Sequence, residues 1–394
     1  VNGKFASERR TIIMTIQGWK ISNPDGNKRV IVTKELPGQR WLEILTRADC
    51  RVEICTSTRV LGIDEIKKGM GDRCDGAIGQ LTEDWGEELF SALKSAGGCA
   101  YSNYAVGFNN VDVEAASRHG IPVGNTPGVL TETTAQMAVA LTFAAARRVG
   151  EAERYIRAGQ YKGWIPSLFI GDLLWQKTVG VVGAGRIGET YARMMAEGHK
   201  MNIIYYDLHQ NKTLEDYIAR YGQFLESVGL APVTCRRAET IAELLRQADC
   251  VSVHTVLDDS TRHLINAESL AQMKENAILI NTSRGPVVDE AALVAHCRTH
   301  PDFRAGLDVF EEEPDLKPGL VDLENVVIVP HIASATKWTR EGMATLAAAN
   351  VAAILSGYPA WQNPDIRPFL GEDPPKAAPS IVNAEAVGVA PAHP

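Results

Sequence analysis

Residues 179–188 decide the fold, and they read Val179-Gly180-Val181-Val182-Gly183-Ala184-Gly185-Arg186-Ile187-Gly188. The glycines at 183, 185 and 188 follow the spacing G-x-G-x-x-G, after an apolar β-rich segment and before a helical one. The first glycine permits a tight turn, the second lets the backbone approach a pyrophosphate, and the third lets the helix pack on the strand. The N-terminus of that helix then offers unpaired N–H groups and a partial positive charge to phosphates. The stretch predicts a strand, turn and helix that bind a dinucleotide.

The next predicted strand ends in an acidic residue. Asp207 directly follows the β-rich residues 202–206 and stands nineteen positions after Gly188. A carboxylate at that point accepts hydrogen bonds from the adenosine ribose hydroxyls and repels a 2′-phosphate. The pattern therefore favours NAD over NADP as the cofactor, with NADH preferred over NADPH.

The second half of the chain alternates β-rich segments with helical or loop stretches. The β-rich segments are 178–182, 202–206, 250–253, 277–281, 304–309 and 326–329. This rhythm is typical of a doubly wound parallel sheet with right-handed crossovers. The insert at 214–233 is longer than an ordinary connection, so we expect it to contain a helix of its own.

The first half is expected to form a smaller parallel α/β unit, from apolar segments at 29–33, 52–56 and 76–81. An Ala-rich helix predicted at 132–148, with Thr133 and Gln136 as its capping box, would connect the two halves. A second Ala-rich helix, predicted at 339–355, would lead back towards the first domain. The tail from Gly371, rich in Pro, Ala and Val, is expected to be a loosely packed extension.

We therefore predict an α/β protein with two Rossmann-like or flavodoxin-like domains, doubly wound parallel sheets and an active-site cleft between them. A chain of 394 residues is too long for one ordinary core. We expect a discontinuous substrate-binding domain at 1–128 and 335–394 and an NAD-binding Rossmann domain at 129–334.

Composition excludes several classes of function. A net charge of −8 argues against nucleic-acid binding, which needs a clustered excess of Lys and Arg. The most apolar run, 137–146, is far shorter than the roughly 20 residues that cross a bilayer, so no membrane span is expected. The seven cysteines are odd in number and contain no C-x-x-C pair. We expect buried thiols in a reducing compartment and no metal site.

Three polar residues each follow a separate predicted strand: Arg284, Glu313 and His331. The carboxyl ends of strands in an open α/β sheet form the ligand crevice, so these side chains should converge near the cofactor. A cation, a carboxylate and an imidazole together indicate an active site rather than three unrelated surface groups.

Three motifs around these residues carry a resemblance to a known family. They are Asn281-Thr282-Ser283-Arg284-Gly285, Gly306-Leu307-Asp308-Val309-Phe310-Glu311-Glu312-Glu313-Pro314 and Pro330-His331-Ile332-Ala333-Ser334. The chain, from about residue 29 to 368, resembles the D-2-hydroxyacid dehydrogenases. The resemblance implies that His331 is the general acid, that Glu313 orients and stabilises the imidazolium, and that Arg284 binds the substrate carboxylate and polarises the keto group.

The resemblance also assigns residues around the catalytic three. Arg186, Ile187, Thr282, Ser283 and Asp308 would line the cofactor, together with Arg284 and His331, and Asp308 would contact the nicotinamide amide. In Ala105-Val106-Gly107-Phe108, the backbone around Val106 and Gly107 would receive the substrate carboxylate. Trp164 aligns with an aromatic that reaches into the neighbouring subunit's active site, against the alternative of simple packing. A homodimer joined through the helices near 132–148 is the family expectation.

Two further stretches are similar to the plant-type, NADH-preferring hydroxypyruvate reductases of this family. They are Asn125-Thr126-Pro127-Gly128-Val129-Leu130-Thr131-Glu132-Thr133-Thr134 and Ser334-Ala335-Thr336-Lys337-Trp338-Thr339-Arg340-Glu341-Gly342-Met343-Ala344-Thr345-Leu346. The similarity implies NADH-dependent reduction of hydroxypyruvate to D-glycerate in the photorespiratory glycolate pathway. Reduction of glyoxylate to glycolate would be a secondary activity.

Other functions stay open at this point. A phosphoglycerate dehydrogenase is disfavoured because no long regulatory domain follows Leu370, and a formate dehydrogenase because that enzyme carries Gln where this chain has Glu313. An NADH-sensing, corepressor-like binding protein would share the fold and the three polar residues.

Two departures from the family pattern bear on the cofactor loop and on location. Thr255 stands where many relatives carry Pro, which would alter the cofactor-contacting loop. The sequence ends in Ala392-His393-Pro394 rather than a peroxisomal S-K-L, and it begins at Val1 rather than Met. We expect a mitochondrial location, with the peroxisome and the cytosol as alternatives.

Overall fold

The computed structural model describes residues 14–16 and 18–392, so residues 1–13 of the predicted substrate-binding domain lie outside the described residues. The chain forms two compact units. Unit 1 contains Val1–Leu130 and Thr336–Pro394, and unit 2 contains Thr131–Ala335. These divisions fall within two residues of the proposed domain boundaries. The α/β fold class is confirmed by the two large sheets, each covered by helices.

The sheet of unit 2 is parallel throughout, in the order β10-β9-β8-β11-β12-β13-β14. The strands are β8 (Thr178–Val182), β9 (Asn202–Tyr206), β10 (Cys235–Arg237), β11 (Cys250–Val253), β12 (Ile278–Asn281), β13 (Arg304–Leu307) and β14 (Val326–Ile328). The chain starts at β8, winds outward to β10, and then returns to β11 on the other side of β8. The order therefore reverses between β8 and β11, the point at which ligands bind in such sheets.

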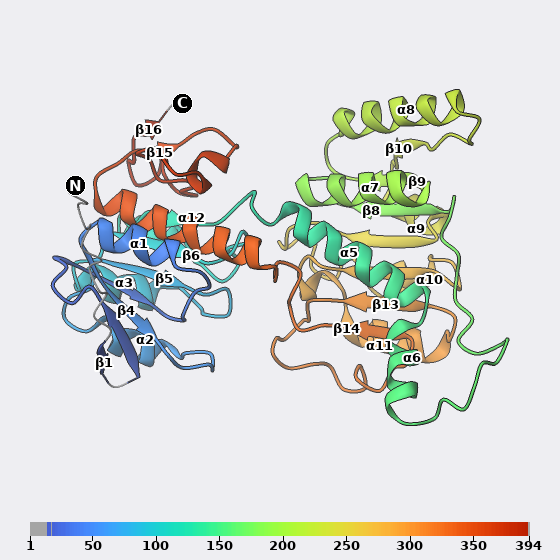
Figure 1. Cartoon of the computed structure of the whole chain (residues 1–394), viewed down its shortest axis with the longest axis horizontal. Helices are drawn as coiled ribbons and strands as arrows, with labels where there is room; N and C mark the ends of the chain where they lie inside the picture. The colour runs from blue at the N-terminus through green and yellow to red at the C-terminus, as the bar shows by residue number, and fades with distance from the viewer. Residues whose placement is uncertain (1–13, 17, 393–394) are drawn as a thin grey trace, which may run out of the picture. The chain divides into compact units, whose positions relative to one another are not determined.

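Helices cover both faces of this sheet (Figure 1). One face packs against α5 (Thr131–Ala146), α7 (Arg186–His199) and α8 (Lys212–Ser227). The other packs against α9 (Ile241–Gln247), α10 (Ala267–Ala271) and α11 (Glu290–Thr299). The helix expected in the 214–233 insert is α8. The predicted capping box is wrong, because α5 begins at Thr131 and Thr133 already lies inside the helix.

Unit 1 has a mixed sheet rather than a wholly parallel one, in the order β1-β2-β4-β3-β5-β6-β7. The strands are β1 (Met14–Ile16), β2 (Trp19–Ser22), β3 (Lys28–Val32), β4 (Cys50–Cys55), β5 (Gly76–Gly79), β6 (Ala100–Asn103) and β7 (Val123–Gly124). Strands β3 to β7 are parallel, but β2 runs antiparallel to both β1 and β4. The prediction of a purely parallel sheet is wrong at this edge. Only two residues separate β1 from β2, and a connection that short joins antiparallel strands.

Two helices lie on one face of this sheet, α1 (Arg40–Arg47) and α12 (Lys337–Leu355), and they pack against each other (Figure 1). The other face is covered by α2 (Ile63–Met70), α3 (Glu87–Ser95) and α4 (Val113–Arg118). The return helix predicted at 339–355 is α12, which begins two residues earlier because Thr336 caps it through the N–H of Thr339.

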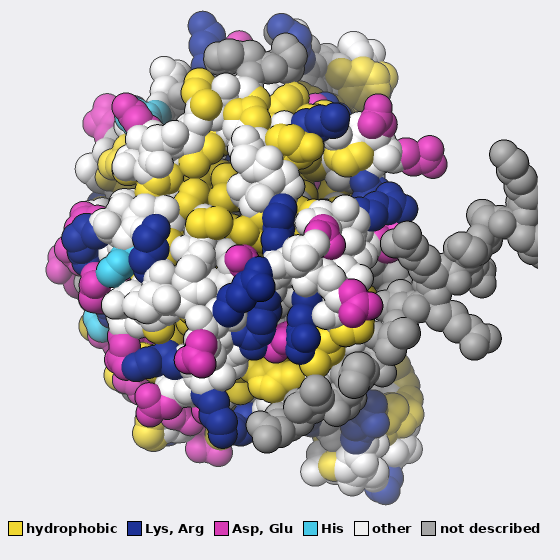
Figure 2. Space-filling view, turned by 90° about the vertical axis from the view of Figure 1, so that its left-hand side faces the viewer, with side chains coloured by type: hydrophobic (Ala, Val, Ile, Leu, Met, Phe, Trp, Pro, Cys, Tyr) yellow, Lys and Arg dark blue, Asp and Glu magenta, His cyan; other side chains and the backbone are white. Residues whose placement is uncertain are grey.

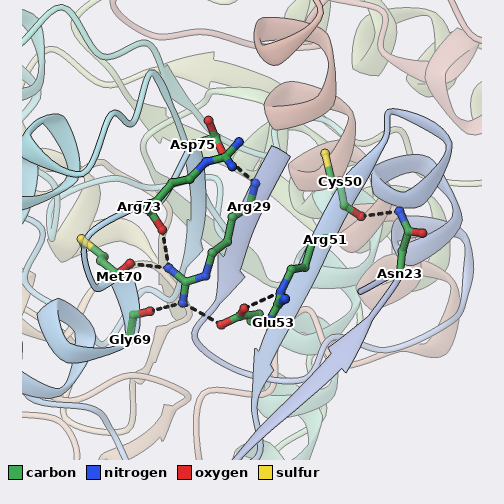
Figure 3. A network of polar contacts seen from close by, with 9 residues as sticks. All are labelled: Asn23, Arg29, Cys50, Arg51, Glu53, Gly69, Met70, Arg73 and Asp75. Carbon is green, nitrogen blue, oxygen red and sulfur yellow. Dashed lines mark hydrogen bonds and ion pairs between the residues drawn. The ribbon is translucent and has the colours of Figure 1, made fainter. Parts of the chain in front are cut away.

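A charged network ties β3, β4 and α2 together (Figure 3). The guanidinium of Arg29 donates to Glu53 at 2.6 Å and to the carbonyl oxygen of Gly69 at 2.7 Å. It also bonds the carbonyls of Met70 and Arg73, so one cation satisfies the end of α2.

The C-terminal tail is well packed, so the expectation of a loose extension from Gly371 is wrong. Its strand β16 (Pro391–Ala392) pairs with β15 (Ala360–Trp361), which lies before the tail together with the short 3-10 helix η2 (Arg367–Leu370). Ala377 and Ala378 are buried. Asn383 accepts a hydrogen bond from the N–H of Val123 at 2.8 Å. Side-chain amides and hydroxyls therefore hold a segment whose composition shows no periodicity.

Charges of both signs are mixed on the surface (Figure 2), and not every thiol is buried. On the face drawn in Figure 2, cationic, anionic and apolar side chains are interspersed. Within residues 14–16 and 18–392, no helix has the length and apolarity to cross a bilayer, and no group of His, Cys, Asp and Glu is arranged to hold a metal. The prediction of buried thiols is wrong for Cys99, which is exposed, and Cys235 is only half-buried.

Candidate active site

The glycine turn after β8 has the shape that its sequence predicts. Gly183 has a φ of +91°, and a Cβ there would lie 2.9 Å from the backbone of His254 and Thr255. A Cβ on Gly188 would lie 2.0 Å from the carbonyl oxygen of Gly183. These two glycines are therefore needed for close approach within the protein. A Cβ on Gly185, in contrast, would meet no protein atom within 4 Å.

Asp207 lies at the end of β9, beside this turn. Its Oδ2 accepts a hydrogen bond from the N–H of Ala184 at 2.8 Å, and Oδ1 accepts from His209 at 3.1 Å. Arg237, which the sequence analysis did not select, donates to the carbonyl of Asp207 at 2.7 Å and to that of Leu208. An anionic and a cationic side chain thus both lie where the ribose end of a dinucleotide would bind.

The residues of unit 2 fit a dinucleotide cofactor. Gly185 is the N-cap residue of α7, and a Cβ on it would meet no protein atom within 4 Å, so protein atoms do not block the approach of a phosphate to this helix N-terminus. Thr282 is buried, and its hydroxyl makes no hydrogen bond among the described residues. A buried polar atom without a hydrogen-bond partner lowers the stability of a folded protein, so the unpaired hydroxyl of Thr282 indicates a ligand-binding position. Arg186 is exposed and Ile187 half-buried, on the first turn of α7.

Arg284 follows β12 in a loop that Asn281 holds. The side chain of Asn281 accepts from the N–H of Ser283 at 3.0 Å and donates to the carbonyl of Arg284 at 2.9 Å. It also accepts from the hydroxyl of Ser283 at 2.8 Å. A Cβ on Gly285 would lie 1.8 Å from the carbonyl oxygen of Phe310, so the missing side chain lets this loop lie against the segment that leads to Glu313.

His331 and Glu313 form a directly bonded pair. Nδ1 of His331 lies 2.8 Å from Oε2 of Glu313, and Oε1 of Glu313 accepts from the N–H of Phe310 at 2.9 Å. Because a carboxylate only accepts, Nδ1 carries the proton in this bond. Burial acts to raise the pKa of Glu313. The hydrogen bond and charge of His331, with the N–H of Phe310 and the charge of Arg284, together outweigh burial, so that pKa lies below its ordinary value.

Asp308 holds the loop on which His331 stands. Its side chain is fully buried, and its two oxygens accept from the N–H groups of Ile332 at 2.6 Å and Ala333 at 2.8 Å. The backbone of His331 has a φ of +51°, and its N–H donates to the carbonyl of Asp308 at 2.9 Å. Burial raises the pKa of Asp308, against the opposing effect of these N–H groups. The structure thus gives Asp308 a holding contact that sequence reasoning missed.

The three catalytic candidates lie within electrostatic reach of one another. The charges of His331 and Arg284 both act on Glu313, and burial lowers the pKa of Arg284 against the opposing charge of Glu313. Nη1 of Arg284 donates to the carbonyl of Ser283 at 2.7 Å. Together they offer a cation that can bind a carboxylate and an imidazole that can give a proton.

The remaining predicted residues lie elsewhere. Val106 and Gly107 belong to unit 1, in the loop after β6, and both are half-buried. Trp164 lies in unit 2, between α6 (Val149–Arg157) and β8, and its side chain is 81% exposed. Within its own subunit Trp164 is therefore not packed in the core.

Comparison with known proteins identifies the family. Residues 139–333 match the NAD binding domain of the D-isomer specific 2-hydroxyacid dehydrogenases. The chain is 61% identical to a glycerate dehydrogenase of Cucumis sativus, over 94% of this chain and 98% of the relative. It is 60% identical to the peroxisomal glycerate dehydrogenase of Arabidopsis thaliana, over 94% of this chain and 97% of that protein.

A solved structure agrees with this result. The NADPH-dependent glyoxylate/hydroxypyruvate reductase of Sinorhizobium meliloti, in complex with NADP and malonate, matches with a TM-score of 0.68 and 30% identity, over 84% of this chain and 95% of that one. This chain belongs to the D-isomer specific 2-hydroxyacid dehydrogenase family. It is an oxidoreductase that uses a nicotinamide cofactor and acts on a small 2-hydroxy or 2-keto acid.

Proposed function

We propose that this enzyme reduces hydroxypyruvate to D-glycerate with NADH, and glyoxylate to glycolate as a secondary activity. The observation that carries the proposal is the His331–Glu313 pair at 2.8 Å, which follows β13 and β14 of the sheet that also carries the cofactor site. The charge of Arg284 acts on Glu313. Identities of 60% and 61% to two glycerate dehydrogenases support the substrate. Photorespiration, as the pathway, stays a prediction.

The chemistry requires a hydride, a proton and a fixed keto acid. When bound, NADH supplies the hydride to C2 of the substrate. His331 gives the proton to the carbonyl oxygen from Nε2, because Nδ1 is bonded to Glu313. Glu313 stabilises the imidazolium form and fixes the plane of the ring. Arg284 binds the substrate carboxylate, and this fixed geometry supplies much of the rate enhancement.

The preference for NADH over NADPH is proposed from Asp207. Its carboxylate would bond the ribose hydroxyls and repel a 2′-phosphate, while Arg237 next to it would attract one. We expect the carboxylate to dominate, since it lies at the end of β9 and is held toward the glycine turn by Ala184. Values of kcat/KM measured with NADH and with NADPH would show which cofactor the enzyme prefers.

Three further roles belong to this proposal. The backbone at Val106 and Gly107 would receive the substrate carboxylate, and Asp308 would contact the nicotinamide amide. The enzyme would be a homodimer, joined through α5 and with Trp164 reaching the neighbouring subunit's site. Exposed apolar side chains on and after α6 support an interface: Ile156, Trp164, Ile170 and Leu173. Sedimentation equilibrium of the wild type and Trp164→Ala would test it.

The experiment for the activity is steady-state oxidation of NADH with hydroxypyruvate, glyoxylate, pyruvate and 3-phosphohydroxypyruvate. Fastest turnover with hydroxypyruvate would support the proposal, and fastest turnover with the phosphorylated acid would move the assignment to a phosphoglycerate dehydrogenase. NADH binding without turnover of any acid would favour the corepressor-like alternative.

The mitochondrial location stays a prediction, which imaging of an internally tagged chain would test.

A further inference from the structure

The loop after β6 has its carbonyl groups held by two buried amides. Nδ2 of Asn125 donates to the carbonyl of Val106 at 2.8 Å, and Nδ2 of Asn103 donates to the carbonyl of Gly107 at 3.0 Å. Both asparagines are buried, at 6% and 0% exposure. The two bonds fix the orientation of two successive peptide groups.

That orientation decides where the N–H groups of the loop point. A trans peptide is planar, so the N–H of the following residue points opposite to each carbonyl. The N–H groups of Gly107 and Phe108 therefore point away from the asparagines. Neither donates to a protein acceptor in the part of the chain that the structure describes. Backbone N–H groups that have no protein acceptor are available to bind an anion.

The amide of Asn103 is itself fixed by its neighbours. Its Oδ1 accepts from the hydroxyl of Tyr101 at 3.3 Å, and its Nδ2 also donates to Oδ1 of Asn110 at 3.0 Å. Asn110 in turn donates to the carbonyls of Gln80 at 3.0 Å and Glu83 at 2.8 Å. The amide groups of the loop are thus anchored to the segment after β5.

The amide of Asn125 is fixed by the C-terminal tail. The hydroxyl of Ser380 donates to Oδ1 of Asn125 at 2.6 Å. Asn350, on α12, accepts from the N–H of Ser380 at 2.9 Å and donates to the carbonyl of Asn125 at 3.0 Å. The carbonyl of Val106 can only accept, so the amide lies with Nδ2 towards Val106, and the hydroxyl of Ser380 donates to the Oδ1 on its other side. The flipped amide would place two oxygen atoms against each other.

We propose that Asn125 and Ser380 are positioning residues for recognition of the substrate carboxylate, and that the C-terminal tail thereby sets the loop that receives it. This inference rests on the proposed role of the Val106–Gly107 backbone. If the network served stability alone, its disruption would lower the melting temperature, and it would not weaken substrate binding relative to NADH binding. A positioning role instead weakens carboxylate binding and spares NADH.

The test uses oxamate, an unreactive carboxylate that has an amide carbonyl where the substrate has its keto group. Calorimetry measures the Kd of oxamate for the NADH-loaded enzyme, and KM for hydroxypyruvate is measured in parallel. We expect Asn125→Asp, which loses the donor to Val106, to raise both the oxamate Kd and this KM by about tenfold or more. Ser380→Ala should raise both several-fold and Ser380→Thr should restore them. KM for NADH should stay within about twofold in every variant.

The matched control is Asn383→Asp. Asn383 is a buried amide of the same tail that donates to the carbonyl of Ile121 at 3.0 Å and contacts no carbonyl of the loop. It should lower the melting temperature without changing the oxamate Kd. The inference would be overturned if Asn383→Asp and Asn125→Asp raised the oxamate Kd equally, or if Asn125→Asp weakened NADH binding to the same extent. It would also be overturned if the wild-type enzyme did not bind oxamate. If the enzyme did not turn over hydroxypyruvate but still bound oxamate in a way that depends on Ser380, only the proposed function would be refuted.

Discussion

Nδ1 of His331 lies 2.8 Å from Oε2 of Glu313, although 18 residues separate them in the chain. The left-handed backbone at His331, with a φ of +51°, turns the imidazole out of the extended path of β14. The carboxylate of Glu313 therefore both orients the imidazole and supports its positive charge when it is protonated.

Replacement of His331 by Gln should lower kcat for hydroxypyruvate by about 10²- to 10⁴-fold, because the proton donor is lost. The Kd for NADH, measured by fluorescence titration, should change little. The control is His119→Gln, which removes a second histidine bonded to a glutamate, Glu87, at 2.7 Å in unit 1. Turnover that survives in His331→Gln, or that falls equally in the control, would contradict the assignment.

Glu313 should determine the acid side of the pH–rate profile. Burial acts to raise its pKa, but contacts with His331 first, and with Phe310 and Arg284, lower the pKa below the ordinary value. The carboxylate, and with it the support of the imidazolium, is therefore present above the unfolded value and lost as the pH falls through the depressed pKa. Glu313→Gln should lower kcat by about 10²-fold and remove this step from a profile measured from about pH 3 to pH 8, a range that extends below the ordinary pKa of a glutamate. An unchanged profile in the variant would refute the role.

The two glycines Gly185 and Gly188 should respond differently to alanine. A Cβ on Gly188 would collide with the carbonyl of Gly183, so Gly188→Ala should lower the free energy of unfolding by about 1–3 kcal/mol and weaken NADH binding. A Cβ on Gly185 meets no protein atom within 4 Å. Gly185→Ala should therefore keep the melting temperature and lower NADH affinity at least about tenfold. Retained affinity in Gly185→Ala would place the pyrophosphate elsewhere.

Substitution of Asp207 should change the choice of cofactor. Asp207→Ser keeps an acceptor oxygen but removes the negative charge, and like-charge juxtaposition costs several kcal/mol. The ratio of kcat/KM for NADPH to that for NADH should rise at least about tenfold. Adding Arg237→Ala should reverse part of this gain, because its guanidinium lies beside Asp207. If this ratio stayed the same in both variants, the adenosine end of the cofactor would bind elsewhere.

The network in Figure 3 should contribute to the stability of unit 1. Arg29→Met leaves Glu53 buried without its 2.6 Å partner and should lower the free energy of unfolding by about 2–4 kcal/mol in denaturant titrations. Burial raises the pKa of Glu53, yet the bonds to Arg29 and Arg51 outweigh it, so that pKa is lowered. The stabilisation is therefore present above the unfolded value and lost as the pH falls through the depressed pKa.

The surface pair of Arg47 with Glu43 is the control for this network. Arg47 is 82% exposed, so Arg47→Met should change stability by less than about 1 kcal/mol. Similar losses in Arg29→Met and Arg47→Met would show that burial of the network adds nothing.

Much of unit 2 could be predicted from sequence, because its signals are local. The strands at 178–182, 202–206 and 250–253 have the predicted bounds, and the glycine turn lies between the predicted strand and helix. The contacts of Arg237 and Asn281 could not be predicted in this way. Arg237 reaches Asp207 across 30 residues, and Asn281 holds a loop through side-chain bonds that have no period in the sequence.

The sequence by itself determined the dinucleotide-binding unit and the identity of the catalytic candidates, because steric demands of glycine and the alternation of apolar segments act over a few residues. Only the tertiary structure decided that Glu313 bonds His331, that Asp308 holds the loop of His331, and that the tail at Ser380 and Asn383 packs on the strands of unit 1. These are hydrogen bonds between segments distant in the chain, and their partners become defined only when folding closes the loops between them.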